Sequence, residues 1–256
     1  MATRRVFITG ASSGIGAALA LHYAGRGATL GLLARRGDKL EEIAAGLPGG
    51  PHRLYPADVT DAAAVAAAAS DFMQGGLPDI VIANAGVSVG TLTEFTEDFT
   101  AFRRVMETNV LGLVATFQPF VAPMTAAGRG TLAGIASVAG IRGLPGAGAY
   151  SASKAAAISY LESLRVEMRD RGVKVVTLCP GYIATPMTAV NTYPMPFMLP
   201  ADVAARRMAR VIGRGSSYAV VPWQMGVVAK LLRLLPNPVY DRLFARAGRK
   251  PRGLEL

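Results

Sequence analysis

Thr9-Gly10-Ala11-Ser12-Ser13-Gly14-Ile15-Gly16, residues 9–16, gives the strongest indication of fold in this chain of 256 residues. It follows a short apolar run and opens a segment of helical composition. Exposed backbone N–H groups and the helix dipole at such a strand–turn–helix junction favour a phosphate anion. We expect Gly10 to permit the tight turn, Gly14 to let the backbone approach a pyrophosphate, and Gly16 to let helix and strand pack closely. The junction predicts a dinucleotide site; the alternative is a tight turn alone.

Outward from this junction, short apolar runs alternate with longer helical segments. Strands joined by helices of this length form right-handed βαβ units and a parallel sheet. Apolar runs without in/out alternation indicate a sheet covered on both faces. The sequence therefore predicts an α/β fold, a doubly wound parallel sheet of Rossmann type, as a single domain over residues 1–256. The predicted strands are 6–9, 29–33, 52–55, 79–83, 130–136 and 173–178, and the predicted helices are 17–26, 38–45, 62–73, 100–120 and 151–170.

Composition bounds the class of protein. Hydrophobic residues make up 51% and charged residues 17%, enough apolar side chains for a large core and too few charges for a disordered chain. Lys+Arg minus Asp+Glu is 27 − 17 = +10, which could serve nucleic acid, an anionic membrane or acidic ligands. Basic residues interleaved with aromatics do not appear, so we expect no nucleic-acid binding. His22 and His52 are isolated, so we expect no metal site. The first residues lack the apolar region of a signal peptide, which favours a cytoplasmic location.

The end of the second predicted strand bears on cofactor choice. A carboxylate there would bind a ribose 2′-hydroxyl and repel a 2′-phosphate. The sequence has Leu33-Ala34-Arg35-Arg36 instead. The planar fork of Arg35 can bind a 2′-phosphate, and Arg36 adds positive charge. We therefore expect NADP(H) to be preferred over NAD(H), with two solvated loop arginines as the alternative.

Tyr150 and Lys154 lie four residues apart at the start of a predicted helix, so their side chains share one face. A tyrosine hydroxyl is a poor acid at neutral pH, and a neighbouring ammonium would lower its pKa. Ser137 ends a predicted strand and could donate a hydrogen bond to a carbonyl substrate. Hydride transfer needs such a proton donor, an orienting hydroxyl and a tuning cation. On spacing alone, however, a helical Tyr/Lys pair is usually a surface feature.

Several motifs occur together in the order and spacing of one known family. They are the glycine-rich stretch of residues 10–16, Asn84-Ala85-Gly86, Asn109, Ser137, Tyr150-Ser151-Ala152-Ser153-Lys154 and Pro180-Gly181. Over residues 4–190 the chain resembles the short-chain dehydrogenase/reductase family. The resemblance implies that Tyr150 is the acid/base, that Lys154 binds the nicotinamide ribose and lowers the tyrosine pKa, and that Ser137 positions the carbonyl. It also implies that Asn109 helps to hold a water-linked proton relay through Lys154.

The same resemblance assigns the cofactor contacts. Asp58-Val59 matches the pair beside the adenine ring, and Arg35 marks NADP-dependent members. The full implied set is Gly10, Ser12, Ser13, Gly14, Ile15, Gly16, Arg35, Arg36, Asp58, Val59, Asn84, Ala85, Gly86, Tyr150, Lys154, Pro180, Gly181, Ile183 and Thr185. Ser13 stands where some NADP-dependent members carry a basic residue, so the expected preference depends mainly on Arg35 and Arg36.

Residues 182–200 match the mobile loop that covers the substrate in this family. The segment holds Met187, Tyr193, Met195, Phe197 and Met198, which suit an apolar substrate. A loop packed on its own protein is the alternative.

Residues 223–250 predict an amphipathic helical extension, with Pro236-Asn237-Pro238 separating two helices. One interpretation is an interfacial helix on anionic lipid, as in a peripheral membrane enzyme acting on lipid-like ketones. The other, which we favour from the sequence, is that the apolar face packs on the lid or a partner subunit. The first helix carries Trp223, Val227, Val228, Leu231, Leu232 and Leu235, and the second Tyr240, Leu243 and Phe244 with Arg242, Arg246, Arg249 and Lys250.

These predictions combine into an NADP-dependent carbonyl reductase, reversible as an alcohol dehydrogenase, acting on a small, apolar molecule. The competing hypothesis is an NADPH-binding sensor or scaffold without turnover. The family resemblance also implies a homo-oligomer, a dimer or tetramer, built through the helices at 100–120 and 151–170.

Overall fold

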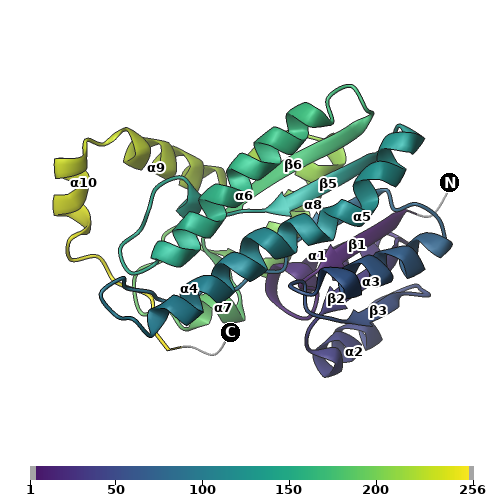
Figure 1. Ribbon diagram of the computed structural model, residues 1–256, viewed down its shortest axis with the longest axis horizontal. Coiled ribbons are helices and arrows are strands. Elements are labelled where there is room, and N and C mark those ends of the chain that lie inside the picture. The colour runs from purple at the N-terminus through teal and green to yellow at the C-terminus, as the bar shows by residue number, and fades with distance from the viewer. Residues whose placement is uncertain (1–3, 254–256) are drawn as a thin grey trace.

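Seven parallel strands form the central sheet of the computed structural model, which describes residues 4–253 (Figure 1). Their order across the sheet is β3-β2-β1-β4-β5-β6-β9, so the chain winds outward in both directions from β1 and β4. This confirms the predicted doubly wound parallel sheet. The strands are β1 Arg5–Thr9, β2 Thr29–Ala34, β3 Arg53–Pro56, β4 Ile80–Ala83, β5 Gly130–Ile135, β6 Val173–Pro180 and β9 Tyr218–Val221.

Helices cover both faces of the sheet, α1, α2 and α8 on one and α3, α5 and α6 on the other. The helices are α1 Gly14–Ala24, α2 Gly37–Ala45, α3 Ala62–Gln74, α4 Asp98–Met106, α5 Gly112–Ala127, α6 Gly148–Glu167, α7 Pro186–Ala189, α8 Ala201–Arg214, α9 Trp223–Leu234 and α10 Asn237–Phe244, with a π-helix η1 Glu107–Leu111 and a 3₁₀ turn η2 Val138–Gly140.

Alternate residues of each strand belong to two separate apolar cores. In β1, Val6 and Ile8 pack under α1, whereas Phe7 packs under α3 and α5 against Phe72 and Phe120. All three β1 side chains are fully buried. Burial on both faces explains why the strand reads as a continuous apolar run.

The helix predicted at 100–120 is longer and is interrupted. It runs from Asp98 to Ala127, and the π-helix Glu107–Leu111 divides it into α4 and α5. By length and composition alone this rod could cross a membrane, since its most apolar window has a mean hydropathy of 1.5. One third of that window is buried, and Phe117, Phe120 and Met124 of α5 are fully buried against the sheet.

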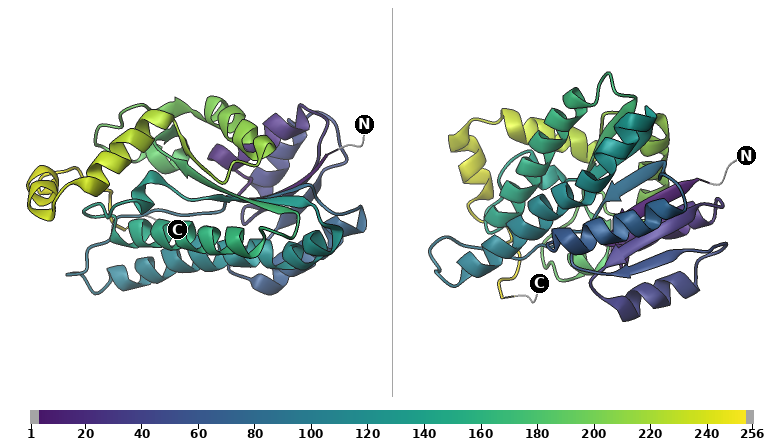
Figure 2. Two further views of the ribbon diagram at one scale, coloured as in Figure 1. Left: turned by 90° about the horizontal axis from the view of Figure 1, so that it is seen from above. Right: turned by 45° about the vertical axis from the view of Figure 1, so that its right-hand side comes forward.

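Residues 201–222 held no predicted element, yet they form α8 and the edge strand β9. Within the segment predicted as a lid, the short strands β7 Ile183–Ala184 and β8 Leu199–Pro200 pair in parallel and enclose α7. The predicted C-terminal extension is present as α9 and α10, which project from the body of the molecule (Figure 2).

Candidate active site

One cleft lies at the carboxyl ends of the central strands, where the strand order reverses, and it collects most of the predicted site residues. In open α/β sheets this is where ligands bind. Gly16 and Asn109 are not among the lining residues. The predicted residues that line the cleft are Gly10, Ser12, Ser13, Gly14, Ile15, Arg35, Arg36, Asp58, Val59, Asn84, Ala85, Gly86, Ser137, Tyr150, Lys154, Pro180, Gly181, Ile183 and Thr185.

The glycine-rich loop depends on missing side chains at two positions. Gly10 has a φ of +68°, and a Cβ there would lie 2.7 Å from the Cα of Ala85. A Cβ on Gly16 would lie 2.2 Å from the carbonyl oxygen of Gly10. Both distances are too short for a side chain, so the expected tight turn and close helix–strand packing are present.

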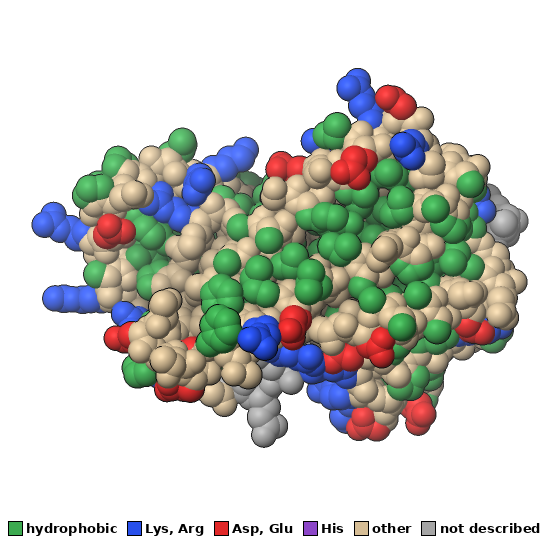
Figure 3. Space-filling model, viewed as in Figure 1, with side chains coloured by type: hydrophobic (Ala, Val, Ile, Leu, Met, Phe, Trp, Pro, Cys, Tyr) green, Lys and Arg blue, Asp and Glu red, His purple; other side chains and the backbone are tan. Residues whose placement is uncertain are grey.

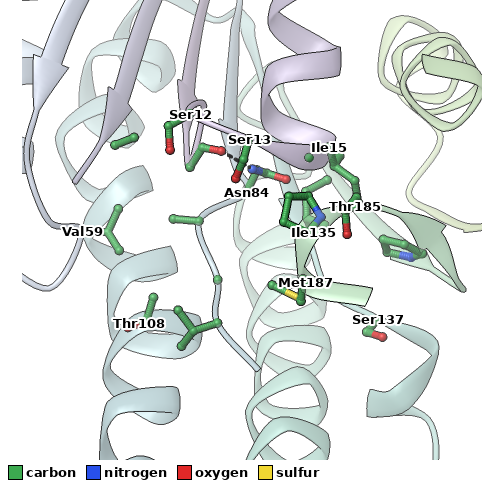
Figure 4. Close-up of a pocket in the computed structure, with 18 of the residues that line it drawn as sticks. Ser12, Ser13, Ile15, Val59, Asn84, Thr108, Ile135, Ser137, Thr185 and Met187 are labelled. Atoms are coloured by element: carbon green, nitrogen blue, oxygen red, sulfur yellow. Dashed lines mark hydrogen bonds between the residues drawn. The ribbon is translucent and has the colours of Figure 1, made fainter. Parts of the chain in front are cut away.

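Asn84 holds this loop from the end of β4. Its Nδ2 donates to the carbonyl oxygens of Thr9 and Gly10, each at 3.1 Å, and its backbone N–H donates to Thr9 Oγ1 at 3.2 Å (Figure 4). The Asn84-Ala85-Gly86 motif therefore braces the glycine loop, besides lining the cleft.

The donor groups of the cleft fit a dinucleotide. Ser13 is the N-cap of α1, and its side chain makes no capping hydrogen bond, so the amino end of the helix faces the cleft with N–H groups to offer an anion. On another wall the buried hydroxyl of Thr108 has no hydrogen-bond partner among the residues described. A ligand with a pyrophosphate between two polar nucleosides matches these donors.

Two arginines and one aspartate meet at the adenosine end of the cleft. Arg36 donates to the hydroxyls of Ser12 at 3.3 Å and Ser13 at 3.1 Å. Arg35 lies 3.9 Å from Asp58, which is more tightly paired with Arg104. Burial raises the pKa of Asp58, but hydrogen bonds from Thr60 and Arg104 outweigh it and leave the pKa lowered. Arg36, rather than Arg35, is the cation joined to the glycine loop.

Ser137, Tyr150 and Lys154 come together at the other end of the cleft. Ser137 follows β5 and caps η2 by accepting from Ala139 N–H at 3.1 Å. Tyr150 and Lys154 are in the first turns of α6, on the side facing the sheet. The Lys154 ammonium donates to the carbonyl oxygen of Ile135 at 2.8 Å and lies 5.8 Å from the centre of the Tyr150 ring. Lys154 is buried and Tyr150 is half-buried at the cleft wall, unlike a surface Tyr/Lys pair.

Burial dominates the electrostatics of this cluster. Burial raises the pKa of Tyr150, and the neighbouring Ser137 hydroxyl lowers it. That Lys154 lowers the tyrosine pKa stays a prediction. Burial also lowers the pKa of Lys154, to about 8. Near neutral pH the lysine is therefore still mostly charged.

Asn109 lies in the π-helix, behind the cleft wall. Its side chain accepts from Val87 N–H at 2.8 Å and donates to Val87 O and Ser153 Oγ, both at 3.0 Å. A Cβ on Gly86 would lie 3.1 Å from the Asn109 amide oxygen and 3.5 Å from the Lys154 nitrogen. Asn109 thus ties the Asn84–Val87 loop to α6; the proton relay through Lys154 stays a prediction.

Several residues that line the cleft belong to no motif recognised in the sequence. Figure 4 shows Val59 and Thr108 on one side of the cleft and Thr185 and Met187 on the other. Thr108 precedes Asn109 and could have been inferred from that motif, whereas Met187 was expected only as part of the lid. The unpredicted lining residues are Ala34, Ala57, Val87, Thr108, Ile135, Ala136, Pro186, Met187 and Thr188.

A glycine turn at a helix amino terminus, placed where a parallel sheet reverses, defines a dinucleotide-binding protein of the doubly wound class. Residues 4–194 match the family described as short chain dehydrogenase. The chain is 40% identical over 248 residues to an uncharacterized oxidoreductase of Myxococcus xanthus, covering 94% of this chain and 96% of that protein.

Solved structures agree. Levodione reductase superposes with a TM-score of 0.78 at 25% identity, covering 87% of this chain and 98% of that one. A 3-ketoacyl-(acyl-carrier-protein) reductase from Brucella melitensis, complexed with NADH, gives 0.76 at 26% identity over 85% of this chain and 94% of that one. This chain belongs to the short-chain dehydrogenase/reductase family of oxidoreductases.

Proposed function

We propose that the protein is an NADPH-dependent carbonyl reductase, reversible as an alcohol dehydrogenase, that takes an apolar ketone or aldehyde. The observation that carries this proposal is that Ser137, Tyr150 and Lys154 lie together at one end of the dinucleotide cleft. A sensor or scaffold would need the cleft but would have no use for this cluster.

The reduced nicotinamide of a bound cofactor would supply the hydride. Tyr150 then donates its phenolic proton to the carbonyl oxygen as negative charge develops there, and Ser137 donates a second hydrogen bond that fixes the oxygen in place. Because the pKa of Tyr150 is raised, its hydroxyl is protonated before the reaction and can act as the proton donor. Lys154, held by Ile135, supplies positive charge beside the resulting phenolate.

The NADPH preference is supported by the cluster of Arg36, Ser12 and Ser13. Arg36 already donates to both serine hydroxyls, and each of the three side chains could bind a 2′-phosphate oxygen. Arg35, whose guanidinium lies 3.9 Å from the Asp58 carboxylate, adds positive charge to the same end of the cleft. Because β2 ends without a carboxylate, a 2′-phosphate meets no repulsion at that strand end.

An apolar carbonyl substrate is supported by the lid, in which Met187 lines the cleft and Tyr182 lies edge-on to Tyr193. The two structural relatives described above are both named as reductases, one of a 3-ketoacyl group.

The test is consumption of NADPH, followed by the absorbance of the reduced nicotinamide, against ketones and aldehydes graded by chain length, with NADH in parallel. Faster oxidation of NADPH than of NADH on long or bulky apolar carbonyls is the expected result. Tight NADPH binding without turnover on any of them would favour the sensor. Faster turnover with NADH would contradict the cofactor preference.

We also propose a homo-oligomer, dimer or tetramer, formed through α4 and α6 in the cytoplasm. Phe99, Leu111 and Val166 expose 63%, 62% and 62% of their surface on these helices and η1, and Figure 3 shows hydrophobic side chains gathered over this face. Light scattering should give a multiple of the chain mass, and Leu111→Glu should lower it.

A further inference from the structure

The C-terminal extension presents an apolar row to solvent. Trp223, Val227, Leu231 and Leu234 are 68%, 49%, 60% and 80% exposed, and their spacing places them along one face of α9. Val239 and Leu243, 46% and 63% exposed, continue apolar surface onto α10. Large apolar side chains gathered in this way mark interaction surfaces.

The opposite side of α9 is the side that packs on the protein. Met225 and Ala229 are buried there, and Met225 lies against Gly181 at the end of β6. The face expected from the sequence to pack on the lid or a partner subunit is a different one: its Trp223, Val227 and Leu231 are exposed in the described chain. Packing on a partner subunit stays a prediction. The exposed row needs another partner.

Basic residues are concentrated on the same extension. Residues 223–250 hold six basic residues and one acidic residue, Asp241, so 6 − 1 = +5 of the total +10 lies in 28 residues. Figure 3 shows Lys and Arg side chains projecting from this part of the molecule with hydrophobic side chains between them. The basic residues are Lys230, Arg233, Arg242, Arg246, Arg249 and Lys250.

The extension is fixed to the loop that follows Ser137. Arg142 donates to the carbonyl oxygen of Leu235 at 2.7 Å and to Asn237 Oδ1 at 3.0 Å, and its guanidinium lies 3.9 Å from the centre of the Tyr240 ring. The Tyr240 hydroxyl donates to the carbonyl oxygen of Gly143. The exposed row therefore has a defined position relative to the catalytic cluster.

Beyond α10, residues 246–252 return across the lid end of the molecule. Arg249 packs on Gly146, Gly248 on Tyr193 of the lid, and Lys250 donates to the carbonyl oxygen of Met187 at 3.0 Å. The extension consequently adjoins the segment through which a substrate reaches the cleft.

We propose that α9 and α10 dock on the surface of an anionic lipid bilayer. The row from Trp223 to Leu234 enters the headgroup region, and the exposed basic side chains bind lipid phosphates. These are Lys230, Arg233, Arg242, Arg246 and Arg249, whereas Lys250 is buried. A second copy of the chain fits this surface less well, because a two-fold interface would place the same positive patch against itself. Docking would bring the lid to the membrane, from which an apolar substrate could enter. The proposal concerns lipid binding and does not depend on the reductase activity.

The experiment is co-sedimentation of the full-length protein with vesicles of equal parts phosphatidylcholine and phosphatidylglycerol, and with phosphatidylcholine alone. Binding to the anionic vesicles, weakened by salt, is the expected result. Lys230→Gln, Arg242→Gln and Arg246→Gln combined should lower the partition coefficient on the order of 100-fold, from about 1 kcal/mol per basic residue. Leu231→Ser with Leu234→Ser should lower it on the order of 10-fold or more.

Matched controls alter exposed residues elsewhere. Leu21→Ser, at a position 52% exposed on α1, and Arg207→Gln with Arg210→Gln and Arg214→Gln on α8, should leave binding unchanged. Failure of the wild-type protein to bind anionic vesicles at low salt would overturn the proposal, as would equal losses in the controls. A lower oligomeric mass for Leu231→Ser with Leu234→Ser would show instead that this face joins two subunits. Tyr150→Phe should bind vesicles normally, which separates this test from that of the activity.

Discussion

Two regions, the cofactor cleft and the C-terminal tail of residues 246–252, each contain a close approach between two backbone segments that only glycine allows. In the cleft, Gly10 and Gly16 make room for Ala85 and for each other. In the tail, Gly90 makes room for Lys250, since a Cβ there would lie 2.1 Å from the Lys250 carbonyl oxygen. The geometry is similar, but only the first set forms a motif that can be recognised in the sequence.

The difference lies in how far apart the partners are along the chain. Gly10, Gly14 and Gly16 act within one turn whose strand and helix are its direct neighbours. Gly90 and Lys250 are separated by most of the chain, and nothing near Gly90 indicates its partner. Contacts between residues close in sequence produce a short motif that can be recognised. Contacts between residues far apart in sequence produce no such motif.

The largest expected effect concerns the catalytic end of the cleft. Tyr150→Phe removes the proton donor and should lower kcat by roughly 100- to 10,000-fold, the usual range for a lost general acid. NADPH affinity, followed by nicotinamide fluorescence, should stay nearly unchanged. Tyr160→Phe, on the same helix but half-buried away from the cleft, is the matched control and should keep full turnover. Activity retained by Tyr150→Phe would refute the mechanism.

The second prediction concerns the adenosine end. Arg36→Leu removes a guanidinium from the proposed 2′-phosphate site, and a charged hydrogen bond is worth about 1.5–3 kcal/mol, so KM for NADPH should rise about 10- to 150-fold. KM for NADH should change little, because NADH lacks that phosphate. Arg210→Leu on α8 serves as the control. Equal changes for both cofactors would mean that Arg36 supports the loop only through Ser12 and Ser13.

Much of the sheet could be predicted because each inner strand is buried on both faces and reads as an apolar run. The edge strand β9 was missed, since Tyr218 is exposed and the strand is only partly covered. The π-helix at Glu107–Leu111 was also missed, because its wider turn shows no change in apolar spacing. Amphipathic α8 was overlooked, although its buried Ala204, Ala205, Met208 and Ile212 follow helical spacing.

In the candidate site, most predicted residues within contiguous motifs line the cleft, with Gly16 as an exception. Arg36 was expected to add charge beside Arg35, but its bonds to Ser12 and Ser13 depend on how β2 lies against the glycine loop. The position of Lys154 was predicted, but not that its ammonium would be directed to the carbonyl oxygen of Ile135. Such orientations depend on neighbours that only the folded chain brings together.

The third prediction tests the tail directly. Gly90→Ala forces a methyl group onto the Lys250 carbonyl and should displace the tail from the lid. We expect KM for an apolar substrate to change by roughly 10-fold, which corresponds to about 1.4 kcal/mol. NADPH affinity should be unchanged. Gly143→Ala is the control, because a Cβ there meets nothing within 4 Å. A parallel loss of NADPH affinity would show that the cleft and the tail are not independent.

The smallest expected effect is a pH dependence of the free energy of unfolding, to which the cleft and the tail each contribute through one buried lysine. Burial lowers the pKa of Lys154 in the cleft and of Lys250 in the tail to about 8 each, from 10.5. Between these values the unfolded chain binds more protons than the folded one, so the free energy of unfolding should rise with pH from about 8. The rise should be read below pH 9, because burial raises the pKa of the Cys179 thiol, which opposes the rise above its ordinary value of 9.0. Tyrosines with raised pKa values, such as Tyr23, oppose it above 10.0. We expect Lys154 to contribute on the order of 1 kcal/mol to this rise in the free energy of unfolding, and Lys250 less, because solvent screens it more.

The measurement is denaturant unfolding at several pH values. The free energy of unfolding of Lys154→Met and of Lys250→Met should each depend less on pH than that of the wild type. Saturating NADPH should alter the contribution of Lys154 and leave that of Lys250 in place, since only the first lines the cleft. If NADPH altered the contributions of both lysines equally, the titrations of Lys154 and Lys250 would be coupled, and the two regions would not be independent.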